Sequence, residues 1–396
     1  MASLDLVSLL QDLVRLPSVN PMGRPVQGDI YYEHRMTAYL ENLFRGMGVR
    51  YERQTMTPGR DNIVARIDGD VSAEDGAPLI MLEAHQDTVP VDHMIIPPFD
   101  PQLRDGRIYG RGSCDIKGGM ASMLWAFQRL ASVRPAGMPT VLMACTVNEE
   151  HGSEGAAKLA ELWERPSALF PRAPDAAIVA EPTSLNVVVA HKGVVRWRVK
   201  THGRAAHSSQ PKMGQNAIYA MGRVLGVIEH YAKEVVPGLG ANRWVGQPTM
   251  SVGVIAGGIS VNTVPDHCMI EVDRRVLPDE SPMEALHHAL RHFEEQLSDT
   301  VSHEAPFSIS HGLSDQLNGP LSQELAAIAR RKFGAGELIG VPFGTNAPRY
   351  AQTGVPTVVF GPGSIDQAHT VDEWVDVEQL AAAGETLYDF VLSHAM

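Results

Sequence analysis

Several apolar runs, rich in β-branched residues, end abruptly in polar residues. They cover residues 79–82, 140–147, 176–180 and 356–360. Continuous apolar strands of this kind are buried on both faces, which is typical of a parallel sheet covered by helices. Helical periodicity follows at residues 118–130, 154–163, 321–333 and 377–392, and a first amphipathic helix contains Leu6 to Val14, capped near Ser3. This alternation predicts an α/β domain with a mostly parallel central sheet.

The middle of the chain has a different order of elements. Strands are predicted at residues 194–201, 249–254, 268–276 and 307–310, and helices at 216–230 and 282–297. The order β-α-β-β-α-β is that of a ferredoxin-like α+β unit. We therefore expect an inserted domain at residues 192–311, with residues 1–191 and 312–396 forming the α/β domain.

Composition narrows the class of protein. A chain of 396 residues exceeds one ordinary hydrophobic core, so two domains are expected. The net charge of -13 argues against nucleic acid or an anionic membrane as a partner. Three cysteines without CxxC spacing indicate reduced thiols. With no signal segment and no apolar stretch of about 20 residues, a cytoplasmic protein is expected.

Five side chains of types that commonly bind metals occur mostly where apolar runs end. They are His85, Asp115, Glu150, Glu181 and His369. In open α/β sheets ligands collect beyond the carboxyl ends of the strands, so these side chains can converge. Two histidines and three acids suit two zinc ions that share one bridging carboxylate, and the same set would accept cobalt or manganese.

The surroundings of three ligands support this reading. Asp87, two residues after His85, can orient the imidazole. Glycines on both sides of Asp115 permit the close approach that a bridging carboxylate needs. Glu149 and Glu150 are adjacent and face different ways, so one can bind metal while the other moves protons. Taken singly, each motif also fits a hydrogen-bonded turn or a solvated charge pair.

Together, the five motifs and their order resemble the co-catalytic zinc amidohydrolases. That family includes acetylornithine deacetylase, succinyl-diaminopimelate desuccinylase, aminoacylase and carboxypeptidase G. The resemblance extends over nearly the whole chain, and residues 361–369 are most similar to the acetylornithine deacetylase version. It implies that Asp115 bridges two metals and precedes a cis peptide bond. It also implies that His85 and Glu181 bind one metal and that Glu150 and His369 bind the other.

The resemblance also implies a lid and homodimerisation role for the inserted domain. His207 would reach the active site of the partner subunit and stabilise the oxyanion of the intermediate. Arg274 and Asn262 occupy positions of substrate contacts, and guanidinium suits a carboxylate. Asn346 stands where the family often has an acid, which weakens the case for a cationic side chain such as that of ornithine.

The expected function is hydrolysis of the amide bond of an N-acyl amino acid. A metal-bridging water would attack the carbonyl, with Glu149 as general acid and base. A carboxypeptidase or dipeptidase of the same family is the alternative, because it needs the same water and the same carboxylate anchor. A non-catalytic, metal-stabilised binding protein is a more remote alternative, and Glu149 argues against it.

Overall fold

The computed structural model describes residues 4–165, 167–297 and 301–396. The chain forms two compact units. Unit 1 comprises Met1–Val189, Asp315–Ile339 and Thr345–Met396, and unit 2 comprises Ala190–Ser314 and Gly340–Gly344. The insertion expected at residues 192–311 lies inside unit 2.

The large sheet has eight strands in the order β1-β2-β6-β3-β7-β17-β8-β16. Their bounds are β1 Arg50–Thr57, β2 Arg60–Ile67, β3 Leu79–His85, β6 Thr140–Thr146, β7 Ala176–Val179, β8 Val187–His191, β16 Leu338–Val341 and β17 Thr357–Val359. The four central strands β6, β3, β7 and β17 are parallel. This arrangement confirms the predicted α/β fold with a mostly parallel central sheet.

Strand β3 is longer than the apolar run that predicts it, and its extra residues include His85. β3 continues three residues beyond the run at 79–82, because Glu83 and His85 remain buried and stay in register with Ala144 and Thr146 of β6. The sheet itself therefore holds His85.

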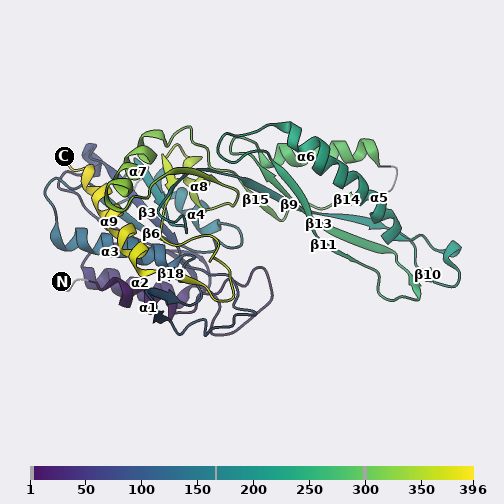
Figure 1. The fold of residues 1–396 in the computed structure, drawn as a ribbon, viewed down its shortest axis with the longest axis horizontal. Helices are drawn as coiled ribbons and strands as arrows, with labels where there is room; N and C mark the ends of the chain where they lie inside the picture. The colour runs from purple at the N-terminus through teal and green to yellow at the C-terminus, as the bar shows by residue number, and fades with distance from the viewer. Residues whose placement is uncertain (1–3, 166, 298–300) are drawn as a thin grey trace. The chain divides into compact units, whose positions relative to one another are not determined.

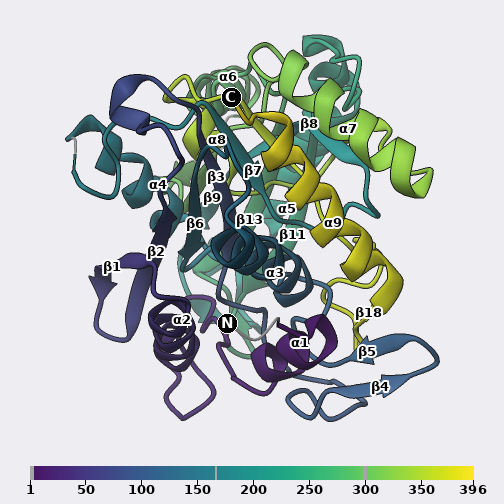
Figure 2. The ribbon, with the colours of Figure 1, turned by 90° about the vertical axis from the view of Figure 1, so that its left-hand side faces the viewer.

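Helices cover the large sheet. They are α1 Leu6–Val14, α2 His34–Met47, α3 Lys117–Val133, α4 Glu154–Ala160, α7 Gly319–Phe333, α8 Ala347–Ala351 and α9 Val377–Ser393. α3 packs on β3 and β6, α9 packs on α3, and α7 packs on α9, with α3 and α9 in front of the strands in Figure 2. α4 packs on β2 and β6, and α8 packs on β7 and β17.

Two predicted helix ends need comment. The N-cap of α1 is Asp5, whose Oδ1 accepts a hydrogen bond from Ser8 N at 2.8 Å, whereas Ser3 lies outside the described residues. α4 ends at Ala160, three residues before the predicted end, and a 3-10 turn at Leu162–Glu164 follows it. A small sheet pairs β4 Gln102–Arg104, β5 Arg107–Tyr109 and β18 Trp374–Asp376.

Unit 2 contains a sheet in the order β11-β13-β9-β14, with antiparallel pairing throughout. Its elements are β9 Gly193–His202, β10 Ala206–His207, α5 Ala217–His230, β11 Thr249–Gly257, β12 Thr263–Val264, β13 His267–Val276, α6 Pro282–Gln296, β14 Val301–His303 and β15 Ser308–Ser310. α5 and α6 pack on β9 and β13 and lie along one side of them in Figure 1. This is the ferredoxin-like arrangement predicted from the order of elements.

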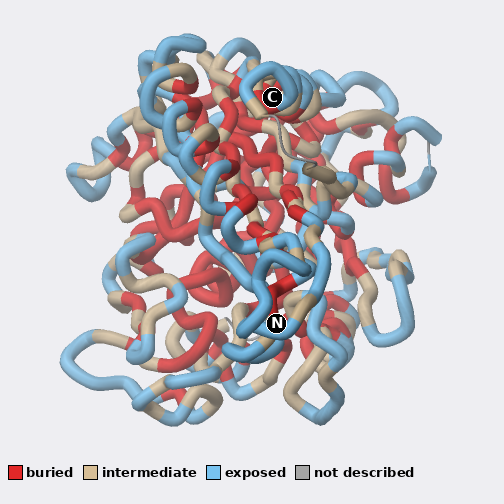
Figure 3. The backbone as a smooth tube through the Cα atoms, turned by 90° about the vertical axis from the view of Figure 1, so that its right-hand side faces the viewer, coloured by how far each residue is buried: buried red, intermediate tan, exposed pale blue. Residues whose placement is uncertain are grey.

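Burial follows the strands. Every residue of β3, β6, β7 and β17 is buried. Figure 3 shows such buried stretches in red between exposed loops in pale blue. Among the described residues, no helix combines the length and apolar character that crossing a membrane requires.

Candidate metal centre

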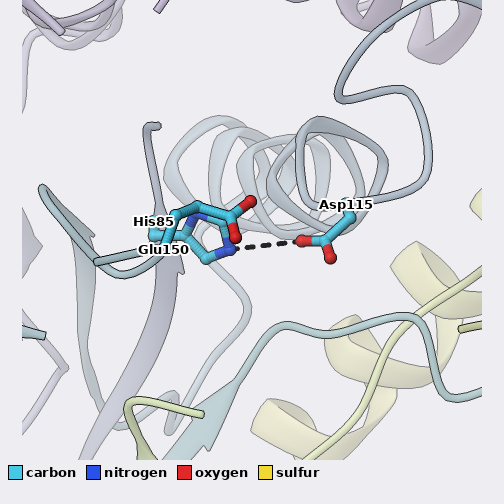
Figure 4. A group of neighbouring side chains, drawn as sticks. All are labelled: His85, Asp115 and Glu150. Carbon is cyan, nitrogen blue, oxygen red and sulfur yellow. Dashed lines mark ion pairs between the residues drawn. The ribbon is translucent and has the colours of Figure 1, made fainter. Parts of the chain in front are cut away.

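The end of β3 presents His85 toward two acids. Its side chain is buried, and its Nε2 lies 3.3 Å from Asp115 Oδ1, the contact dashed in Figure 4, and 4.0 Å from Glu181 Oε1. Its Nδ1 lies 2.9 Å from the backbone carbonyl oxygen of Asp87. Because a carbonyl oxygen only accepts hydrogen bonds, Nδ1 carries the proton in the neutral ring. Nε2 then keeps its lone pair for a metal.

Asp115 lies between two histidine and glutamate pairs. Its Oδ1 faces His85, while its Oδ2 lies 3.3 Å from His369 Nε2. His369 Nε2 also lies 3.4 Å from Glu150 Oε2. The structure thus groups Asp115 with His85 and Glu181 on one side and with His369 and Glu150 on the other. The Asp115-Ile116 peptide bond is cis, as the resemblance implied.

The donor atoms fit a metal ion. His85 Nε2, Asp115 Oδ1 and Glu150 Oε1 are buried and have no hydrogen-bond partner among the described residues. One ligand atom from each of these residues lies within 4.8 Å of the other two. Buried polar atoms are rarely left without a partner, and cations bound at this centre would satisfy all three of them.

The electrostatics of the centre also favour a cation. Burial raises the pKa of Glu149 and of Glu181 well above the usual range, and the neighbouring carboxylates add to the effect. Burial alone would lower the pKa of His369, but Asp115 and Glu150 outweigh it and raise that pKa to about 11. The site concentrates negative charge that protons or metal ions must balance.

Asp87 connects the imidazole of His85 to the turn that carries Glu149 and Glu150. Its carboxylate accepts hydrogen bonds from the backbone N–H of Glu149 at 3.1 Å and of Glu150 at 3.2 Å. Asn20 Nδ2 donates to the same carboxylate at 2.7 Å and to Asn148 Oδ1 at 2.8 Å. The Glu149 carboxylate itself makes no hydrogen bond to the described residues. The sequence did not reveal Asn20, which belongs to no motif and follows the first helix in a polar loop.

Asn346 has a different environment from the one expected. It is buried, and its Nδ2 donates to Glu83 Oε1 and to Thr146 Oγ1, both at 3.1 Å. Glu83 is also fully buried and lies two residues before His85, on the same face of β3. Glu83 therefore places a carboxyl group beside the amide of Asn346, and the expected effect of Asn346 on a cationic substrate side chain stays a prediction. Substrate contact by Asn346 stays a prediction, and it would require these buried hydrogen bonds to open.

Two predicted residues of unit 2 lie close together. His207 is exposed on β10 and pairs with Thr263 of β12, while its Nδ1 lies 2.7 Å from Ser209 Oγ. The adjacent Asn262 accepts a hydrogen bond from Ser208 N at its backbone oxygen, at 3.0 Å. The β10–β12 ladder thus joins the two motifs.

Arg274 points into the interior of unit 2. Its side chain is fully buried, its Nη2 pairs with Glu280 Oε1 at 2.8 Å, and its Nη1 donates to the Arg275 carbonyl. A substrate carboxylate could reach Arg274 only after this ion pair opens. The alternation of residues along β13 predicts this burial, because position 274 lies on the same buried face as Ile270 and Val272. Arg275 faces the other side of the sheet and is partly exposed.

Comparisons with known proteins identify the relatives of this chain. A family model described as peptidase family M20/M25/M40 matches residues 81–393. The chain is 34% identical over 351 residues to an acetylornithine deacetylase of Myxococcus xanthus, which covers 86% of this chain and 87% of that protein.

Solved structures share the fold over almost the full length. An M20 family metallo-carboxypeptidase of Sulfolobus solfataricus superposes with a TM-score of 0.79 at 17% identity, covering 99% of both chains. A dinuclear metal-binding peptidase of the M20 family from Bacillus subtilis gives a TM-score of 0.68 at 16% identity, covering 98% of this chain and 97% of that one. At these identities the likeness concerns the fold.

Proposed function

Because the chain belongs to peptidase family M20/M25/M40 and is a metal-dependent hydrolase of amide bonds, we propose that it removes the acyl group from an N-acyl amino acid. The observation that carries this proposal is the position of Asp115 between two histidine and glutamate pairs, with Glu149 beside them. The relative named acetylornithine deacetylase supports the choice of an acyl amino acid over a peptide.

We assign two divalent metals to the centre. His85 and Glu181 would hold one, Glu150 and His369 the other, and Asp115 would bridge them. Two bound cations would polarise the acyl carbonyl and lower the pKa of the attacking water. Zinc is the proposed metal, since imidazole and carboxylate donors suit it, although cobalt and manganese fit the same donors.

The protein residues move the proton. Glu149 accepts a proton from the attacking water and passes it to the nitrogen of the leaving amine as the C–N bond breaks. The product is a carboxylic acid and a free amine, so atoms and charge balance. Asp87 holds the turn that carries Glu149 through the two backbone hydrogen bonds, which keeps the carboxylate in place while the proton is transferred.

The substrate test is amine release from a panel by the metal-loaded protein. The panel contains N-acetyl-ornithine, N-succinyl-diaminopimelate, neutral N-acetyl amino acids and dipeptides. Preference for one acyl amino acid supports the proposal. Hydrolysis of dipeptides alone would contradict it and make the chain a peptidase with the same metal centre.

The catalytic role of Glu149 has its own test. E149Q keeps the size and the backbone contacts of the side chain but cannot accept a proton. We expect kcat to fall by about 10² to 10⁴, while the metal content per chain stays that of the parent protein. Near-normal turnover would remove Glu149 from the mechanism.

We further propose a homodimer that forms through unit 2. The outer edge of β11 pairs with no other strand in the described part of the chain, and Val254 and Ile255 on it are 45% and 57% exposed. A second copy of this edge would cover these side chains and pair the free backbone groups. A monomeric mass of the parent protein in solution, together with full activity, would contradict the dimer.

In such a dimer His207 would stabilise the oxyanion in the active site of the other subunit. Mixing E149Q chains with H207A chains tests this assignment. In a mixed dimer, one site would combine an intact Glu149 with an intact His207, so activity should return. Mixed dimers as inactive as the two parent variants would contradict a role across the interface. The cytoplasmic location remains a prediction.

A further inference from the structure

A fully buried carboxylate beside the metal centre has no place in the mechanism described above. Glu373 follows His369 by four residues and precedes β18. Its Oε2 accepts hydrogen bonds from Arg111 Nη1 at 2.6 Å and from Gly112 N at 3.0 Å. Its Oε1 accepts from Cys114 N at 2.9 Å and from Asp115 N at 3.0 Å. Each oxygen therefore has two donors.

The loop at residues 111–115 is shaped around this carboxylate. Three of its backbone N–H groups point to one place, and successive N–H groups of this kind form a concave anion site. Gly112 has a φ of +82°, and a Cβ atom there would lie 2.7 Å from Thr88 Cγ2, so only glycine permits this path. The chain supplies the anion of this site from its own residue 373.

The contact joins two segments that carry metal ligands. One bond holds the backbone amide of Asp115 itself, whose carboxylate lies between His85 and His369. The backbone oxygen of Glu373 also accepts a hydrogen bond from Gly110 N at 3.0 Å, so side chain and main chain hold the same loop. The segment that contains His369 is thereby fixed to the segment that contains Asp115.

We propose that Glu373 is a positioning residue that sets the geometry of the bridging carboxylate. It holds Asp115 in register with His369, so that Asp115 Oδ2 and His369 Nε2 can bind the same metal. The inference rests on the proposed dinuclear centre. It assigns no chemistry to Glu373, whose buried carboxylate is taken up by its four hydrogen bonds to residues 111–115.

A glutamine cannot replace this carboxylate. E373Q has nearly the same volume, but one of its two terminal atoms is an NH2 group that would face two N–H donors. Two of the four hydrogen bonds would be lost, whichever way the amide turns. The change should lower the affinity for the metal held by Asp115, Glu150 and His369 more than the affinity for the metal held with His85 and Glu181. Loss of a residue that orients a metal ligand typically lowers metal affinity by about 10- to 100-fold.

Two further variants separate positioning from general stability. R111M removes one donor and the buried ion pair but leaves all three backbone hydrogen bonds to the Glu373 carboxylate. It should lower the melting temperature while changing the affinity for metal little. E378Q is the matched control, because Glu378 is exposed in the first turn of α9.

The experiment is stepwise titration of the metal-free proteins with Zn²⁺, followed by calorimetry and by metal content per chain, with melting temperatures recorded alongside. The parent protein and E378Q should bind two equivalents. E373Q should bind one equivalent with an affinity near that of the parent and the other at least tenfold more weakly. Equal affinities in E373Q and the parent, or equal losses in E373Q and R111M, would overturn the role of Glu373. A parent protein that binds no second equivalent would instead refute the dinuclear centre itself.

Discussion

The replacement D87N tests how the protein supports its metal centre. Asp87 is fully buried, and its carboxylate accepts hydrogen bonds from Asn20 Nδ2 and from the backbone N–H groups of Glu149 and Glu150. Its Oδ1 also lies 3.6 Å from His85 Nδ1. Asparagine keeps the shape but presents one NH2 group where the carboxylate had an acceptor oxygen, so at least one of these donors loses its partner.

The magnitude follows from the bonds that are lost. A hydrogen bond to a charged group contributes about 1.5–3 kcal/mol. Losing one corresponds to roughly a 10- to 100-fold change in an equilibrium or rate constant, at about 1.4 kcal/mol per factor of ten. We therefore expect D87N to lower both the affinity for the metal held with His85 and the value of kcat/KM by about that factor, which agrees with typical losses for such partners of metal ligands.

The assay is turnover measured across a Zn²⁺ titration. Excess metal should restore occupancy in D87N but only part of kcat, because the turn that carries Glu149 also loses a hydrogen bond. D105N is the control, since Asp105 is exposed in a turn with a φ of +50°, which asparagine tolerates. Metal affinity and kcat/KM within twofold of the parent would refute the reasoning.

Three further outcomes are expected. His191 is buried, and burial lowers its pKa to about 4, so between pH 6.5 and 4 the unfolded chain binds a proton that the folded chain does not. The free energy of unfolding measured in urea should therefore fall by roughly 3 kcal/mol over this pH range in the parent protein but not in H191N. The same pH dependence in both proteins would contradict this prediction. A Cβ at Gly361 would lie 2.6 Å from the Glu181 carbonyl oxygen, so G361A should lower stability by about 1–3 kcal/mol and weaken metal binding, whereas G46A, with open space, should do neither. Removal of the metal with a chelator should lower the melting temperature and abolish turnover, and added metal should restore both, because a ligand that binds the folded state stabilises it. An unchanged melting temperature would argue against a bound metal.

The sequence was sufficient to predict the fold and to propose a set of metal ligands, for a physical reason. Strands buried on both faces leave continuous apolar runs, and the residues just past their ends lie at one edge of a parallel sheet. The sequence alone therefore predicts that His85, Glu150 and Glu181 lie close together. The order of elements at residues 192–311 likewise predicted the sheet of unit 2, because that connectivity has few antiparallel solutions.

Alternation along β13 indicates which way Arg274 points. Period-two burial in β13 places Arg274 with Ile270 and Val272, on the face that α5 and α6 cover. The guanidinium pairs with Glu280, while the contact of Arg274 with a substrate carboxylate stays a prediction. Burial of the neighbouring strand positions decides such cases, and residue type alone does not.

Only the tertiary structure decided which buried groups support the ligands. Asn20 lies 67 positions from Asp87, and Glu373 lies 258 positions from Asp115, yet each makes a direct hydrogen bond to that residue. Glu83 likewise meets Asn346 across 263 positions. Local patterns report on periodicity and on strand ends, but contacts at these separations depend on how the loops fold back over the edge of the sheet. The sequence therefore determined which residues can bind metal, and the folded chain determined what holds them in place.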